Sequence, residues 1–326
     1  GFTGFTQQMA AMKNGASALL IINKHITPTA VKSNMYINRY RKTQRINTFY
    51  ISEALAERII GPGYTAQKTG NGPQVYAANV ALRFNKATIT MQSSNVLGIL
   101  EGSDLKDEYV ILTAHYDHLG KRGDTIWYGA DDDGSGTVTI LELAKAFTKA
   151  KAAGKGPRRS ILFMTVSGEE KGLWGSDYYS SHPAVPLHQT TANLNIDMIG
   201  RIDPGRRHGD STNYIYIVGD DKLSTDLKRI SESVNKKYSR LELDYKYNDP
   251  NDPERIYYRS DHYNFAKKGV PVIFYFSGLH PDYHKPSDTP DKINYLLMQK
   301  RAQLVFFTAW DMANRNAMLK RDLPLP

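Results

Sequence analysis

From residue 80 onward, short apolar runs alternate with amphipathic segments. The apolar runs have the length of strands and lie at 80–85, 95–102, 109–115, 160–167, 192–197, 214–218 and 270–276. Segments with the helical spacing of apolar positions lie at 135–151, 172–181, 223–238, 262–268 and 294–317. Continuous apolar runs indicate strands buried on both faces. The pattern therefore predicts an α/β fold, in which a mixed, mostly parallel central sheet is flanked by helices on both faces.

The first 75 residues follow a shorter and less complete pattern. Residues 7–23 predict a helix, a turn and an apolar strand, and residues 46–52 predict a second strand. Ser52 is a suitable N-cap for a helix that follows it. The turn-rich stretch 61–74 indicates a boundary. We expect a small, partial α+β domain over 1–75 and the main domain over 76–326.

Composition narrows the class of protein. Hydrophobic residues make up 40% and charged residues 23% of the 326 residues, as in ordinary globular proteins. The net charge is +9, but the basic residues are scattered and accompany no nucleic-acid-binding module, so we expect no nucleic-acid partner. The absence of cysteine excludes disulfides, thiolate metal ligands and a cysteine nucleophile. No apolar run approaches the roughly 18 residues of a membrane span.

Imidazole and carboxylate side chains follow three of the expected strands. His115 ends one strand, Glu169 and Glu170 follow the next, and Asp197 follows a third. Ligands of open α/β sheets bind beyond the carboxyl ends of the strands, so these groups should meet. Acids brought together repel one another unless a cation neutralises them. Imidazole with carboxylates suits Zn²⁺ or a similar divalent ion, and we therefore predict a hydrolytic metal site.

Local spacing suggests roles within that site. Asp117 is close enough to His115 to fix its tautomer, as carboxylates do for metal-bound imidazoles. The sequence GADDDGSG (129–136) precedes a helix and lacks the alternating spacing of an EF-hand calcium loop. Glu169 and Glu170 point in different directions from an extended backbone, so one can bind metal while the other handles a proton. Each motif alone also fits an ordinary polar turn or helix start.

Three histidines near the end of the chain are further candidates. They are His262, His280 and His284. The last two are four residues apart, but Pro281 disfavours a helix that would present both on one face. Spacing alone leaves the choice among them open.

Taken together, these motifs resemble the co-catalytic di-zinc exopeptidase family, over about residues 90–315. They occur in the order TAHYDHLG, GADDDGSG, SGEEKGLWGS, NLNIDMIG, RSDHYNF and YHKPSDT. The family includes secreted bacterial aminopeptidases, glutamate carboxypeptidase II, glutaminyl cyclases and the transferrin receptor ectodomain. The segment MKNGASALLIIN (12–23) is similar to the end of a protease-associated domain, so the resemblance implies that 1–75 is part of one.

The resemblance implies two Zn²⁺ ions, or another divalent ion, and a set of ligands. The implied ligands are His115, Asp131, Glu170, Asp197 and His284. Asp131 would bridge both metals and precede a cis peptide bond, whereas Asp132 and Asp133 would be backbone and capping residues. Asp117 would orient the first histidine, and Glu169 would be the general base. The resemblance leaves His118, His262 and His280 with supporting or unrelated roles.

Two weaker correspondences concern the substrate. Tyr283 looks like a phenol that stabilises the oxyanion, and Arg259 looks like a contact for a substrate or product carboxylate. The implied activity is removal of N-terminal residues from peptides, with a water shared by the two metals as nucleophile. The alternatives are a mono-zinc acyltransferase like glutaminyl cyclase, a carboxypeptidase acting on acidic dipeptides, and a non-catalytic receptor-like ectodomain. We expect an exported protein whose targeting signal is not part of this sequence.

Overall fold

The computed structural model describes residues 4–23, 46–64, 72–84 and 92–325. The chain divides into two compact units, Gly1–Thr90 and Met91–Pro326. The first unit contains α1 (Gly4–Lys13), β1 (Ala18–Ile22), β2 (Asn47–Ile51) and α2 (Glu53–Ile60), with β1 and β2 parallel. Ser52 caps α2, because its Oγ accepts a hydrogen bond of 3.2 Å from the backbone N–H of Leu55.

The division between the units falls later than the expected boundary at residue 75. The Tyr76 hydroxyl donates a hydrogen bond of 3.2 Å to the Gly63 carbonyl, and the Phe84 ring packs edge-on against Phe49 at 5.4 Å. Tyr76 and Phe84 therefore pack on the first unit. The strand predicted at 80–85 does not form over residues 80–84, and residue 85 lies outside the described ranges. An apolar run becomes a strand only where a neighbouring edge takes its backbone hydrogen bonds, and the Phe84 ring of this run packs on Phe49 of the first unit. That the first unit is part of a protease-associated domain stays a prediction.

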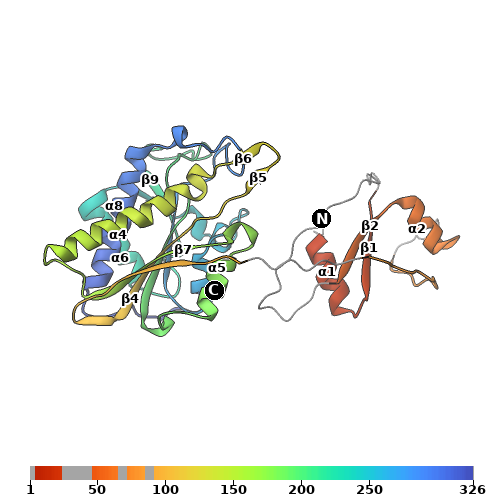
Figure 1. The fold of residues 1–326 in the computed structure, drawn as a ribbon, viewed down its shortest axis with the longest axis horizontal. Helices are drawn as coiled ribbons and strands as arrows, with labels where there is room; N and C mark the ends of the chain where they lie inside the picture. Colours follow the sequence, from red (N-terminus) through yellow and green to blue (C-terminus); the bar gives the residue numbers. More distant parts are fainter. Residues whose placement is uncertain (1–3, 24–45, 65–71, 85–91, 326) are drawn as a thin grey trace. The chain divides into compact units, whose positions relative to one another are not determined.

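The second unit is built on a seven-stranded sheet of order β10-β9-β11-β8-β4-β7-β3 (Figure 1). The strands are β3 (Val96–Leu100), β4 (Leu105–His115), β7 (Arg159–Val166), β8 (Thr190–Ile196), β9 (Tyr214–Val218), β10 (Glu242–Asp244) and β11 (Val272–Phe276). All neighbours are parallel except β3 with β7 and β9 with β11. The predicted mixed, mostly parallel sheet is confirmed. A separate hairpin, β5 (Gly120–Arg122) and β6 (Thr125–Trp127), was not predicted.

Helices cover both faces of this sheet, as predicted. One apolar core lies under α4 (Gly136–Ala152), α6 (Leu227–Val234) and α8 (Tyr295–Asn314), and the other lies under α5 (Trp174–Ser181) and α7 (His262–Ala266). Short 3-10 turns span Glu169–Lys171, Leu187–Gln189, Lys246–Asn248, Ile256–Tyr258 and Pro290–Lys292, and π-turns span Ala130–Ser135 and Asn235–Ser239. No helix in the described ranges has both the length and the hydropathy that crossing a bilayer requires.

The sheet order explains how distant motifs meet. The strands β8, β4 and β7 are parallel neighbours, and His115 at the end of β4 pairs with Val166 at the end of β7. Asp197 directly follows β8, and Glu169 and Glu170 follow β7 after a short turn. The carboxyl ends of three strands therefore deliver the predicted groups to one end of the sheet.

Candidate active site

Asp132 lies at the centre of the candidate site. Two groups of side chains have potential ligand atoms within 4.8 Å of one another, His115 with Asp132 and Asp197, and His118 with Asp132 and Glu170. Both groups contain Asp132. Its Oδ1 lies 3.2 Å from His115 Nε2, and its Oδ2 lies 3.1 Å from His284 Nε2. One carboxylate thus faces two imidazoles, as a carboxylate shared by two metals would.

This geometry corrects the expectation for Asp131. The Asp131 carboxylate accepts a hydrogen bond of 2.6 Å from the Gly200 N–H, and its Oδ2 lies 3.3 Å from His280 Nε2. The Asp131 carboxylate therefore faces Gly200 and His280, away from the two imidazoles that the Asp132 carboxylate faces. The cis peptide bond joins Asp132 to Asp133, one position later than expected. Three identical residues in succession carry no sequence signal that distinguishes which one faces the strand ends.

The neighbouring aspartates hold the loop in place. Asp133 accepts hydrogen bonds from the backbone N–H groups of Gly136 at 2.9 Å, His115 at 3.0 Å and Met198 at 3.2 Å. Asp133 therefore has the capping and backbone role expected of it, whereas Asp132 does not. The buried Asp288 carboxylate accepts from the N–H groups of Asp131 and Asp132, at 3.1 and 3.2 Å. Asp288 lies in the YHKPSDT stretch, and sequence analysis missed its role.

We call His115, Asp132 and Asp197 the His115 group. His115 Nε2 lies 3.2 Å from Asp132 Oδ1 and 3.7 Å from Asp197 Oδ1. Burial alone would lower the pKa of the His115 imidazole, but the adjacent Asp197 and Asp132 raise it well above its ordinary value. The carboxylates therefore create a strongly negative potential in a buried pocket, which favours a bound cation.

We call Asp132, Glu170 and His284 the His284 group. His284 Nε2 lies 3.1 Å from both Asp132 Oδ2 and Glu170 Oε2. Burial would lower the pKa of His284, but these two carboxylates raise it to about 9. Of the three late histidines, the structure places only His284 between these carboxylates. The His262 ring is buried and stacks instead on the Phe274 ring, with the two ring centroids 4.7 Å apart.

Asp117 acts differently from its predicted role. His115 Nδ1 lies 2.9 Å from the Asp117 backbone carbonyl, which can accept its N–H, while the carboxylate lies 3.9 Å away. The Asp117 carboxylate accepts a hydrogen bond of 3.1 Å from the Glu169 N–H. Asp117 therefore orients His115 through its backbone and the Glu169 turn through its side chain. A two-residue spacing does not distinguish these two modes of contact.

Behind Asp197, a chain of buried hydrogen bonds crosses the sheet. The Ser260 hydroxyl donates to Asp197 Oδ2 at 2.6 Å, and Asn195 Nδ2 donates to Ser260 Oγ at 2.9 Å. The Thr113 hydroxyl donates to Asn195 Oδ1 at 2.6 Å. These bonds fix the orientation of the Asp197 carboxylate. Sequence analysis missed Ser260, although it lies in the RSDHYNF stretch.

The buried atoms of the site fit a metal. His115 Nε2, Asp132 Oδ2 and Glu170 Oε1 are buried and have no hydrogen-bond partner among the described residues. Buried polar atoms almost always have a partner, and leaving them without one is costly. Imidazole nitrogens and carboxylate oxygens, with no thiolate, form the type of ligand set that catalytic zinc sites use. The donor types and the unpartnered atoms therefore both fit zinc.

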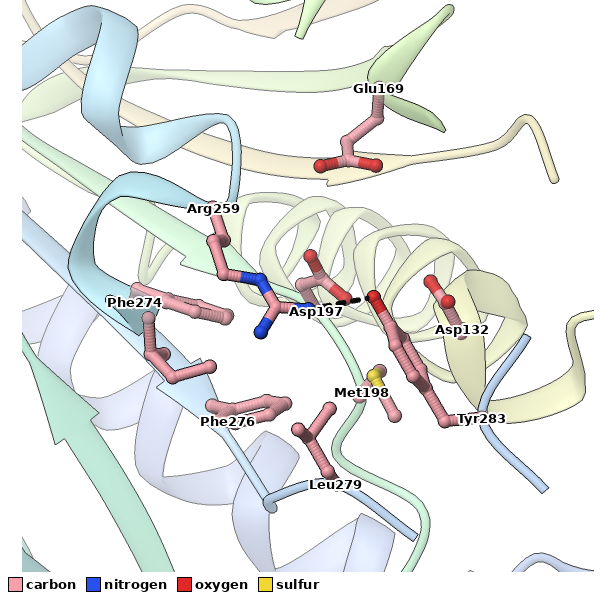
Figure 2. Close-up of a pocket in the computed structure, with 10 residues that line it drawn as sticks. Asp132, Glu169, Asp197, Met198, Arg259, Phe274, Phe276, Leu279 and Tyr283 are labelled. Atoms are coloured by element: carbon pink, nitrogen blue, oxygen red, sulfur yellow. Dashed lines mark hydrogen bonds between the residues drawn. The ribbon is translucent and has the colours of Figure 1, made fainter. Parts of the chain in front are cut away.

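A pocket opens beside these groups (Figure 2). Glu169 lies above the hydrogen-bonded pair of Arg259 and Tyr283 in this view, and the carboxylates of Asp197 and Asp132 lie beside Tyr283. Apolar side chains form the remainder, namely Met198, Ile256, Phe274, Phe276 and Leu279. This lining suits an apolar group held next to polar chemistry.

The polar residues of the pocket are close to one another and partly shielded from water. The Arg259 Nη2 donates a hydrogen bond of 3.1 Å to the Tyr283 hydroxyl, and Arg259 Nη1 lies 3.6 Å from Glu254. Burial and the nearby Asp132 raise the pKa of Tyr283, so its phenol keeps its proton. Burial also raises the pKa of Glu169 well above its ordinary value, and His115 partly opposes this.

Comparison with known proteins agrees with the fold and the motifs. Residues 95–309 match the model of peptidase family M28. A probable leucine aminopeptidase from Arthroderma otae is 31% identical over 217 residues, which cover 64% of this chain and 56% of that protein. The chain thus spans about half the length of the curated relatives it matches.

Solved structures share the fold. An aminopeptidase from Aneurinibacillus sp. strain AM-1 gives a TM-score of 0.62 at 21% identity, covering 100% of this chain and 70% of that one. A zinc aminopeptidase from Bacillus subtilis gives 0.59 at 21% identity, covering 99% and 71%. The family model spans well over half of the chain and contains all the motifs from the first strand-end histidine to His284. The chain therefore belongs to peptidase family M28.

Proposed function

We propose that this protein is a zinc-dependent aminopeptidase that removes N-terminal residues from peptides. The observation that carries the proposal is the shared position of Asp132 between the His115 group and the His284 group, next to a pocket that contains Glu169. The similarity to proteins described as aminopeptidases supports the choice of reaction. The family that the motifs resemble includes secreted bacterial aminopeptidases. On that ground we propose that this protein acts outside the cytoplasm.

Two zinc ions would be held by the two groups. The His115 group offers one imidazole and two carboxylates, and the His284 group offers the same set with Asp132 in common. Zinc bound there supplies Lewis acidity, which lowers the pKa of a water molecule and polarises a carbonyl group. The two groups argue against the mono-zinc acyltransferase, and the complete set of ligands argues against the non-catalytic ectodomain.

Glu169 is the proposed general base. Its carboxylate lines the pocket, is 11% exposed and lies 3.9 Å from His115 Nε2. Burial raises its pKa, and a raised pKa makes the carboxylate a stronger base, which favours taking a proton from the attacking water before returning it to the leaving amine. The hydrogen bond from the Glu169 N–H to Asp117 holds the turn that carries it.

Tyr283 and Arg259 are proposed to act on the substrate. Arg259 donates to the Tyr283 oxygen, which leaves the phenolic O–H free to donate to the oxyanion that forms on the scissile carbonyl. The apolar wall of the pocket would hold the side chain of the N-terminal residue.

One observation favours a carboxypeptidase as the second candidate. The Arg259 guanidinium lines the pocket and is 37% exposed, so it can reach a substrate carboxylate. Its contacts with Tyr283 and Glu254 already use part of its hydrogen-bonding capacity, and this disfavours that role. The aminopeptidase therefore remains the better-supported function.

A substrate panel tests the proposal directly. Peptides with a free N-terminus, their N-acetylated forms and C-terminally amidated forms are incubated with the protein, before and after chelation and with zinc restored. We expect cleavage at the free N-terminus, insensitivity to C-terminal amidation and loss of activity on chelation. Cleavage that tolerates acetylation but requires a free C-terminus would instead establish the carboxypeptidase.

The mechanism is tested with Glu169→Gln. This variant keeps the shape of the side chain but removes the base, so we expect kcat to fall by about 10²–10⁴. Zinc content should not change, because Glu169 lies outside both proposed groups of ligands. Glu101→Gln is the matched control, since Glu101 is an exposed surface residue. Full activity of Glu169→Gln with two bound zinc ions would contradict the mechanism.

A further inference from the structure

His118 is the second histidine of the HYDHLG stretch and lies beside the His284 group. It follows β4, and its imidazole is only 9% exposed. Room for this ring comes from Gly129, because a Cβ atom added there would lie 2.4 Å from His118 Cγ and 2.3 Å from the Asp132 carbonyl oxygen. The sequence therefore places a residue without a side chain where the ring enters the site.

Three atoms that surround one small volume lack hydrogen-bond partners. His118 Nδ1, Asp132 Oδ2 and Glu170 Oε1 are all buried and unpartnered among the described residues. The nitrogen lies 2.8 Å from the Glu170 oxygen and 3.9 Å from the Asp132 oxygen. An imidazole nitrogen and two carboxylate oxygens that converge without aligned hydrogen bonds are an arrangement that a cation would satisfy.

His284 approaches the same carboxylates from another direction. The rings of His118 and His284 are 6.0 Å apart at an interplanar angle of 67°. His118 lies against Oε1 of Glu170, and His284 lies 3.1 Å from Oε2. Ligand atoms around a tetrahedral zinc ion with bonds near 2.0 Å are separated by about 3.3 Å. The separations of 2.8 to 3.9 Å in this cluster lie around that value.

We propose that His118 binds the zinc ion of the His284 group directly, as a fourth protein ligand. The proposal rests on the two-metal function proposed above. The His284 position would then have two imidazoles and two carboxylates, with water or substrate as a fifth ligand, whereas the His115 position has one imidazole and two carboxylates. Imidazole favours zinc and cobalt over magnesium and manganese, so His118 makes the His284 position the more zinc-selective of the two.

The test is a metal titration of the wild-type protein and two variants, each as the full chain. Wild-type, His118→Ala and His118→Gln proteins are stripped of metal and titrated with Zn²⁺ in competition with a chromophoric chelator. A parallel Co²⁺ titration records visible absorption, which changes when a nitrogen ligand is lost. His208→Gln is the matched control, because the His208 side chain is 64% exposed and contacts Asp244 rather than the site.

We expect His118→Ala and His118→Gln to lose more than about 100-fold in affinity at one position, because loss of a residue that only supports a ligand already costs about 10–100-fold. The affinity of the other position and the His208→Gln control should remain close to wild type. The cobalt absorption of the affected position should change in both His118 variants. Thermal unfolding of the metal-free proteins checks that the variants are folded.

Several outcomes would overturn the proposal. If His118→Gln keeps wild-type affinity, His118 merely donates a hydrogen bond to Glu170, since an amide N–H can replace that donor. If both variants keep wild-type affinity, His118 has no part in metal binding. If the wild type binds only one zinc ion, the two-metal function fails, while a His118-dependent affinity for that ion would still support His118 as a ligand.

Discussion

Removing the charge from each of two adjacent aspartates in turn tests whether Asp132, and not Asp131, is the carboxylate shared by the two groups. Asp132→Asn removes the charge of the carboxylate that both groups share, at 3.2 Å from His115 and 3.1 Å from His284. Since loss of a supporting residue alone costs about 10–100-fold in metal affinity, loss of a shared ligand should cost about 100-fold or more for each ion. Catalytic activity should fall with metal content.

Asp131→Asn should behave in the opposite way. The amide oxygen of asparagine can still accept the 2.6 Å hydrogen bond from Gly200, and only the charge beside His280 is lost. A weakened hydrogen bond of this kind costs about 1 kcal/mol of unfolding free energy. For a unit of this size, that lowers Tm by roughly 2–4 °C. Zinc content should remain at the wild-type value.

The assay compares the two variants with wild type under the same conditions. Zinc is measured by elemental analysis after dialysis, affinity by competition with a chelator, and Tm by thermal unfolding of the metal-free proteins. Loss of zinc from Asp131→Asn, together with retention of zinc by Asp132→Asn, would refute the assignment. That result would restore Asp131 as the shared ligand.

Three further predictions follow from the pocket and the core. Tyr283→Phe should lower kcat by about 10²–10³ with little change in KM, because it removes one oxyanion donor, and steady-state kinetics checks this; an unchanged kcat would exclude the role. Phe274→Leu should raise the kcat/KM ratio of N-terminal Phe over Leu substrates by about tenfold, because a smaller lining side chain enlarges the apolar part of the pocket; a lower ratio would count against placing the substrate's N-terminal side chain there. Burial raises the pKa of Asp220 to about 7, above its unfolded value, so folding binds a proton and stability falls as pH rises from about 4 to 7. Asp220→Asn should therefore raise Tm at pH 8 more than at pH 4, and equal shifts at both pH values would contradict this.

Much of the fold could be predicted because the central strands have a strong local signal. β9 begins and ends at the predicted residues, and the bounds of β4, β7, β8 and β11 lie within four residues of the predicted ones. Their apolar runs are long enough to require burial on both faces. The hairpin β5–β6 and the strand β10 have three residues each and no such run, so local pattern did not indicate them.

The candidate ligands on strand ends were predictable for the same reason. His115, Glu170 and Asp197 follow apolar runs, and parallel neighbours bring their carboxyl ends to one edge. Residues that belong to loops were not predictable in this way. Asp288 and Ser260 act through hydrogen bonds to residues more than 60 positions away, and no short-range pattern encodes such a partner.

The amino-acid sequence by itself determined the chemistry available at the site and the strands that carry it. Residue type decides which atoms can bind a metal, and hydrophobic pattern decides where a buried strand must end. Only the tertiary structure decided that Asp132 and not Asp131 faces both histidines, and that His118 enters the site across Gly129. Those choices depend on distances of a few ångströms between segments far apart in the chain, which packing of the sheet and its loops sets and local sequence does not.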